Sequence, residues 1–116
     1  MAASSPLARL TDIVEAIELI QTEMAGVTLA AFESDRRKRW LVERGIEIIP
    51  EASRRLPAAM KARHREIPWP KVAGIGNVLR HAYQNVAHDV LYHVVHDNLK
   101  PLETACRDEL GRERRA

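Results

Sequence analysis

The sequence predicts an all-α protein, an antiparallel four-helix bundle with one short extra helix and no sheet. Aromatic residues make up only 4% of the 116 residues, while Ala, Leu, Ile and Val are abundant, a composition that suits helices packed on helices. Apolar residues also recur at steps of three and four along most of the chain. A chain of this length forms one domain, residues 1–116, whose charged tail, residues 107–116, is expected to fray.

The first helix is expected to begin at Ser4 or Ser5 and to stop at Gly26. Serine caps the N-terminus of a helix, and Pro6 fits its first turn. Glycine is the residue that most readily ends a helix. The apolar residues of this segment share a helical spacing: Leu10, Ile13, Val14, Ile17, Ile20 and Met24. They predict the face that packs on the core.

A second, long helix is expected to run from the capping residue Thr28 toward Arg55, with Pro57 after its end. Pro50 lacks an N–H and should kink this helix. Its predicted core residues are Phe32, Trp40, Ile46 and Ile49, widened by Leu41 and Ile48. The basic run Arg36–Arg39 spreads around the helix, so a solvated surface with one or two functional members is the favoured interpretation.

The segment from Pro57 to Pro70 is the most irregular. A short helix is expected over Ala58–His64, followed by an extended elbow at Ile67–Pro70, because residues before proline avoid the helical region. Within this elbow, Trp69 is expected to pack between helices, with stacking on a base as the less favoured alternative.

The last helix is expected after a turn at Asn85–Asp89, and Pro101 is expected either to kink it or to end it. The residues on its predicted inward side share one stripe: Val86, Val90, Val94, Leu99 and Leu102, with Leu91 and Val95 beside them.

Charge and composition exclude several classes of protein. The net charge of +2 is too small to signal a strong nucleic-acid binder, so RNA contacts would have to come from a local patch. Cys106 is the single cysteine, which excludes an intramolecular disulfide and a cysteine-based zinc site. His93 and His96 have a spacing that zinc ligands use, but no carboxylate completes a ligand pattern, and neither a metal nor a cofactor is expected. With no apolar run long enough for a membrane span, a cytoplasmic protein is predicted.

The stretch Val72–Gln84, VAGIGNVLRHAYQ, carries the candidate functional residues. On a helix, Asn77 and His81 lie four residues apart, and Arg80 is adjacent to His81. An imidazole exchanges a proton near neutral pH, and a guanidinium suits phosphate. A structural histidine and a solvated arginine are the commoner interpretation of such spacing alone.

The wider sequence resembles the HepT-like ribonucleases of the HEPN superfamily. The resemblance rests on N-x-x-R-H-x-Y at residues 77–83, on the following DVLYHVVHDNLKPL, and on the upstream GIEIIPEASRRLP and RHREIPWPKVAGIGN segments. It extends roughly from Leu10 to Leu102. The family signature is an Arg, four to six residues, a His, any residue and a Tyr. His81 and Tyr83 match its second half, whereas Gly76 occupies the position of the Arg, and Arg80 is the nearest guanidinium.

The resemblance implies a homodimeric, metal-independent endoribonuclease, the toxin of a type II/VII-like toxin–antitoxin system. Its implied partners are an RNA substrate and a minimal nucleotidyltransferase antitoxin that transfers AMP to Tyr83. The implied catalytic residues are His81 for proton transfer, Arg80 for the phosphate and Asn77 for orientation. The alternative is a catalytically degenerate HEPN dimer that acts as a partner or RNA-binding protein, which Gly76 favours.

Overall fold

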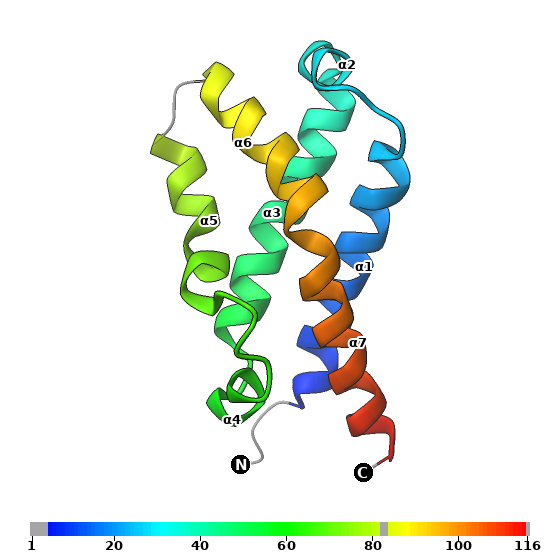
Figure 1. Cartoon of the computed structure of the whole chain (residues 1–116), viewed down its shortest axis with the longest axis vertical. Coiled ribbons are helices and arrows are strands. Elements are labelled where there is room, and N and C mark those ends of the chain that lie inside the picture. The colour runs from blue at the N-terminus through cyan, green and yellow to red at the C-terminus, as the bar shows by residue number, and fades with distance from the viewer. Residues whose placement is uncertain (1–4, 82–83, 116) are drawn as a thin grey trace.

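The computed structural model describes residues 5–81 and 84–115, and their side chains except those of residues 78–81 and 84–87. These residues form seven helices and no strand, which confirms the all-α prediction. The helices are α1 (Pro6–Met24), α2 (Leu29–Ser34), α3 (Arg36–Arg54), α4 (Ala58–Ala62), α5 (Trp69–His81), α6 (Gln84–Asp97) and α7 (Leu99–Arg115). Figure 1 shows α1, α3 and α5 running in alternate directions, with α6 and α7 returning along them.

The start and end of α1 confirm the prediction from local sequence. The Oγ of Ser5 accepts a hydrogen bond from the N–H of Leu7 at 3.1 Å, and Pro6 is the first helical residue. Two residues after α1 ends, Gly26 takes a φ of 73°, a left-handed conformation that glycine adopts without steric cost.

The prediction of one continuous helix from Thr28 to Arg55 was wrong, because the structure has two helices in this segment. Thr28 does cap a helix, because its Oγ1 accepts the N–H of Ala31 at 3.1 Å, but α2 ends after six residues. Asp35 then takes extended backbone angles, and its Oδ1 accepts the N–H of Lys38 at 3.1 Å. An aspartate that caps a new helix cannot also continue the previous one. Pro50 lies inside α3, which continues to Arg54.

The C-terminal half also differs from the prediction. The prediction of a turn at residues 85–89 was wrong, because α6 begins at Gln84 and includes these residues. The predicted last helix divides at Asn98 into α6 and α7, and Pro101 lies in the first turn of α7, where a missing N–H costs no helical hydrogen bond. The helix then continues through the charged tail to Arg115, with Glu109 and Leu110 buried.

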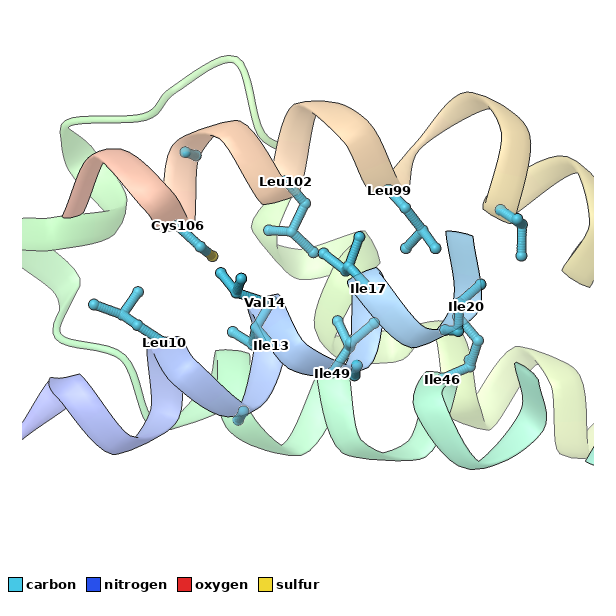
Figure 2. Close-up of a cluster of buried hydrophobic side chains, with 14 of the residues drawn as sticks. Leu10, Ile13, Val14, Ile17, Ile20, Ile46, Ile49, Leu99, Leu102 and Cys106 are labelled. Carbon is cyan, nitrogen blue, oxygen red and sulfur yellow. The ribbon is translucent and has the colours of Figure 1, made fainter. Parts of the chain in front are cut away.

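The hydrophobic core lies where α1 packs between α3 and α7, as Figure 2 shows. All six apolar residues predicted on α1 are buried, together with Ile46 and Ile49 of α3. Trp40 is the exception: its 64% exposure makes its assignment to the core wrong. It lies one turn after Arg36, whose guanidinium carbon is 5.8 Å from the ring centroid. Such a cation–π contact accommodates an exposed indole on a helix surface.

Helices α1 and α3 approach closely at Gly45. A Cβ built at this position would lie 2.4 Å from the Cδ1 of Ile20, so any side chain here requires Ile20 to shift. Among the residues described, no helix has both the length and the apolar character needed to cross a bilayer.

Candidate functional site

The candidate motif lies on α5, which begins earlier than the sequence predicts. Pro68 precedes the helix, and its carbonyl oxygen accepts the N–H groups of Lys71 and Val72 at 2.9 and 3.0 Å. The predicted elbow therefore becomes helical at Trp69. The indole Nε1 of Trp69 donates to the carbonyls of Lys61 and His64, both at 3.1 Å. Trp69 thus anchors the start of α5 on the α4 segment and is partly buried, as predicted.

The predicted site residues fall in the second half of α5 and just after it. Asn77 is exposed. Arg80 and His81 are the last two residues of α5, and their side chains lie outside the described part of the structure. Tyr83 also lies outside the described residues. From helix geometry alone, position 81 follows position 77 by four residues, or about 6 Å along the axis on the same face.

A cavity of about 510 Å³ lies beside the motif. Its walls come from α1, α3 and α5, and α5 contributes Ala73, Gly76 and Asn77. The charged residues that line it are equal in number for the two signs: Arg9, Arg44 and Arg54 with Asp12, Glu47 and Glu51. Each of these arginines is paired with one of these carboxylates, at 4.0, 3.2 and 2.9 Å respectively.

Arg54 differs from the other two arginines because it also contacts the motif helix. Its Nη1 donates to the carbonyl oxygen of Ala73 at 2.5 Å, one turn before Asn77. Its carboxylate partner, Glu51, also accepts the Nε of Arg55 at 3.0 Å. The hydrogen bonds from Arg54 and then Arg55 lower the pKa of Glu51, so this carboxylate stays ionised at neutral pH.

The basic run of α3 is largely engaged in contacts within the chain. The Nζ of Lys38 lies 3.4 Å from a carboxylate oxygen of Glu23, and Arg39 donates to the carbonyl of Glu33 at 2.5 Å. Arg36 packs against Trp40. These contacts agree with the interpretation that the run is mainly a solvated surface.

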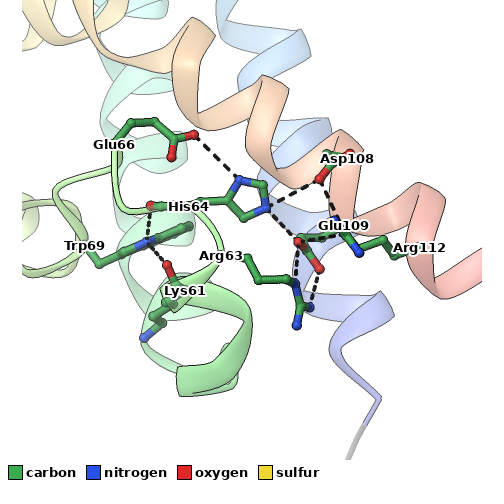
Figure 3. A network of polar contacts seen from close by, with 8 residues as sticks. All are labelled: Lys61, Arg63, His64, Glu66, Trp69, Asp108, Glu109 and Arg112. Atoms are coloured by element: carbon green, nitrogen blue, oxygen red, sulfur yellow. Dashed lines mark hydrogen bonds and ion pairs between the residues drawn. The ribbon is translucent and has the colours of Figure 1, made fainter.

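A second polar cluster, which the sequence did not reveal, joins α7 to the segment after α4 (Figure 3). The Glu109 side chain is only 2% exposed, and its oxygens accept Arg63 Nη2 and Nε at 2.6 and 3.1 Å. The Nε2 of His64 lies 2.6 Å from Glu109 Oε2. The hydrogen bond from Arg63 is the largest influence that lowers the Glu109 pKa to about 2. The partners are 45 and 46 residues apart, so no local spacing marks the cluster.

This cluster includes the one group of potential metal ligands found within residues 5–81 and 84–115. Ligand atoms of His64, Asp108 and Glu109 lie within 4.8 Å of one another. A cation there would have to displace Arg63, which already neutralises Glu109. The arrangement therefore fits an ion-pair network that holds two segments together better than it fits a metal centre.

His93 and His96 on α6 contact different partners. The ring nitrogens of His93 lie 3.1 Å from Asp89 and 3.9 Å from Asp97, and its side chain is 61% exposed. The ring of His96 packs 4.3 Å from the Tyr92 ring, measured between centroids. Both side chains therefore contact residues of their own helix.

Comparison with known proteins agrees with the family resemblance of the sequence. Residues 13–108 match the Ribonuclease HepT-like family. A protein named "Probable ribonuclease HepT" from Thermococcus cleftensis is 38% identical over 94 residues, which cover 81% of this chain and 86% of that protein. A "Putative RNase" from Caldanaerobacter subterraneus subsp. tengcongensis is 26% identical over 110 residues, 95% of this chain and 98% of that protein. No solved structure gives a significant match. The chain belongs to the HepT-like ribonuclease family of the HEPN superfamily.

Proposed function

We propose that this protein is a metal-independent endoribonuclease in which His81 transfers protons, Arg80 contacts the scissile phosphate and Asn77 orients the phosphate or the ribose. The observation that carries the proposal is family membership over residues 13–108, combined with the positions of Asn77, Arg80 and His81 on one helix, α5. Asn77 is exposed beside a cavity, and position 81 follows one turn later on the same face.

RNA contains its own nucleophile, and this removes the need for a metal-bound water. The ribose 2′-oxygen attacks the adjacent phosphorus, a base takes the 2′-hydroxyl proton, and the bond from phosphorus to the 5′-oxygen breaks. An acid then protonates the departing 5′-oxygen. An imidazole serves as base or acid near neutral pH, and a guanidinium stabilises the charge on the phosphorane. The products are a 2′,3′-cyclic phosphate and a 5′-hydroxyl.

The proposal includes a homodimer, because a second copy supplies a second motif to one cleft. Of the described α5 side chains, residues 69–77, none is fully buried in the single chain, although Val72 and Ile75 are apolar. A helix left half-covered in this way is suited to packing against its symmetry mate. The predicted antiparallel four-helix bundle belongs to the same proposal. Its four helical segments are α1, α3, α5 and the α6–α7 pair.

The decisive experiment replaces His81 and compares it with an exposed histidine outside the motif. His81→Ala should reduce RNA cleavage by about 10²–10⁴-fold, the usual loss for a general acid–base group, with the helical content unchanged. His93→Ala, on the exposed surface of α6, should cleave RNA like the wild type. Equal activity of all three proteins would remove His81 from the mechanism.

The proposal extends to regulation in a toxin–antitoxin pair, with a minimal nucleotidyltransferase as partner in the cytoplasm. This part rests on the family resemblance. AMP attached to Tyr83 would add bulk and negative charge two residues after His81 and so repel RNA. Co-expression with the partner should add AMP to the wild type, as read by intact mass, and not to Tyr83→Phe. Tyr92→Phe is the matched control, because the Tyr92 hydroxyl is occupied by the Val27 carbonyl at 2.8 Å.

A second candidate function is a non-catalytic helical partner or RNA-binding protein, and Gly76 is the observation that favours it. The signature places an arginine at this position. If the wild type cuts no RNA and Gly76→Arg switches cleavage on, the chain is a degenerate member and this second function holds. If the wild type is active and Gly76→Arg changes little, another cation already serves the phosphate.

A further inference from the structure

We propose that Arg54, on α3, binds an RNA phosphate in the cavity beside Asn77, and so brings to the site a guanidinium from outside the motif. This inference rests on the proposed ribonuclease function and adds a phosphate-binding residue to it. The two helices involved, α3 and α5, pack side by side (Figure 1).

The position of Arg54 is the first argument. Its hydrogen bond to the Ala73 carbonyl places the guanidinium against α5 one turn before Asn77. Residues 73, 76 and 77 share one helical face and all line the cavity, as does Arg54. At position 76 this wall has a glycine, which has no side chain to fill the space.

The donors of Arg54 are the second argument. A guanidinium has five N–H donors in a planar fork. Among the residues that the structure describes, Arg54 uses Nη1 for Ala73 and Nη2 for Glu51. Within the described structure, its Nε and the second N–H of each Nη are left for a ligand, and its side chain is 51% exposed. A phosphate, with several acceptor oxygens, matches such a fork.

The charge balance is the third argument. The lining charges of the cavity cancel in number, so an anion binds there more favourably if an arginine can leave its carboxylate. Glu51 is shared between Arg54 and Arg55, and these three residues together carry one net positive charge. When Arg54 turns its fork to a phosphate, Arg55 still balances Glu51. The exchange is inexpensive, because the Arg54 and Glu51 side chains are each about half exposed and exposed ion pairs are weak.

Neither of the other two cavity arginines has these features. The guanidinium of Arg44 is paired with Glu47, its neighbour on α3, and its side chain is 72% exposed. Arg9 lies 4.0 Å from Asp12 on α1. In the described structure neither has a hydrogen bond to α5, so neither is held at the motif.

The test uses Arg55 as a matched control. Arg54 and Arg55 are the same residue type, have side-chain exposures of 51% and 58%, and pair with the same carboxylate, but only Arg54 lines the cavity. Arg54→Ala should lower the rate of RNA cleavage by about 10²–10³-fold, the usual loss when a donor to developing charge is removed. Arg55→Ala should lose far less activity than Arg54→Ala, because Arg55 balances Glu51 but does not line the cavity. Equal losses in both variants would overturn the proposal.

A binding measurement separates this proposal from the ribonuclease proposal. Affinity for a 2′-O-methyl RNA, which cannot be cleaved, should fall in Arg54→Ala. The slope of the logarithm of affinity against the logarithm of salt concentration should decrease by about 0.7, the value for one lost contact to a single strand. A merely structural role for Arg54 would leave that slope unchanged and overturn the proposal. If the wild type binds this RNA without cutting any RNA, the ribonuclease proposal fails and the slope still decides the role of Arg54.

Two further variants address folding and position. Arg54→Gln keeps an amide donor for Ala73 but has no charge. It should therefore show the same loss of cleavage and the same decrease in salt dependence as Arg54→Ala, while keeping the wild-type melting temperature. Gly76→Arg in the Arg54→Ala background should restore cleavage, because a guanidinium from position 76 enters the same cavity. Restored cleavage supports the shared role. A folded double variant that stays inactive, while Gly76→Arg alone is active, would overturn it.

Discussion

The ion pairs of Glu109 make a quantitative prediction about stability. Glu109→Gln keeps the size of the side chain and removes its charge, so the bidentate pair with Arg63 is lost. A pKa lowered from 4.5 to about 2 corresponds to about 3 kcal/mol, because a tenfold change in proton affinity is worth about 1.4 kcal/mol. Arg63 is 43% exposed and regains water when the pair is broken. The expected loss in the free energy of unfolding at pH 7 is therefore smaller, about 2 kcal/mol.

The sign of the pH dependence follows from the lowered pKa. The stabilisation by Glu109 is fully present above about pH 4.5 and is lost as the pH falls toward about 2, because the unfolded chain takes up the proton first. Urea denaturation of wild type and Glu109→Gln should thus differ most at pH 7, and by less than half as much at pH 3.

The control for this comparison is Asp108→Asn on the same helix. Its side chain is 49% exposed, and its nearest basic partners, His64 and Arg112, are both at 3.6 Å, so little stability should be lost. A Glu109→Gln difference below about 0.5 kcal/mol at pH 7, or one that does not change with pH, would refute the reasoning.

Three further predictions concern the core. Gly45→Ala should lower the free energy of unfolding by about 1 kcal/mol, since overpacking against Ile20 outweighs the better helix propensity; in an Ile20→Val background, which lacks the clashing Cδ1, urea denaturation should show a smaller cost. Cys106, 1% exposed and with its pKa raised to about 12 by burial, should react with a thiol reagent at pH 8 only after denaturation. Tyr92→Phe should cost about 1 kcal/mol in the same denaturation assay, because its hydrogen bond to Val27 is lost.

The sequence predicted the features that depend on neighbouring residues. The ends of α1 follow from Ser5, Pro6 and Gly26, which act within one turn of themselves. The break at Asp35 was missed, because an aspartate on a helix surface and an aspartate at a cap look alike in sequence. Trp40 was misplaced, because apolar spacing identifies a stripe but not which of its edges meets solvent.

In the candidate site, too, the features that depend on neighbouring residues could be predicted, and those that depend on tertiary packing could not. The order of Asn77, Arg80, His81 and Tyr83 can be recognised in the sequence, because these residues lie within seven consecutive positions. The contact between Arg54 and Ala73 joins residues 19 apart on different helices, and it exists only because α5 packs on α3. Nothing in the spacing of the sequence distinguishes Arg54 from its neighbour Arg55.

The sparse burial of residues 69–77, the part of α5 whose side chains are described, has a consequence for the native-state fluctuations of this protein. Helix α1 fixes seven buried residues between α3 and α7, whereas residues 69–77 of α5 contribute none and pack chiefly against α3. Segments with few buried apolar contacts open at a lower free-energy cost than the global transition. We therefore expect the amide protons of α5 to exchange with solvent through local opening. Those of α1 should exchange only through complete unfolding. The motif helix then acts as a separate cooperative unit, and whatever binds it, RNA or a second subunit, slows its exchange and leaves α1 unaffected.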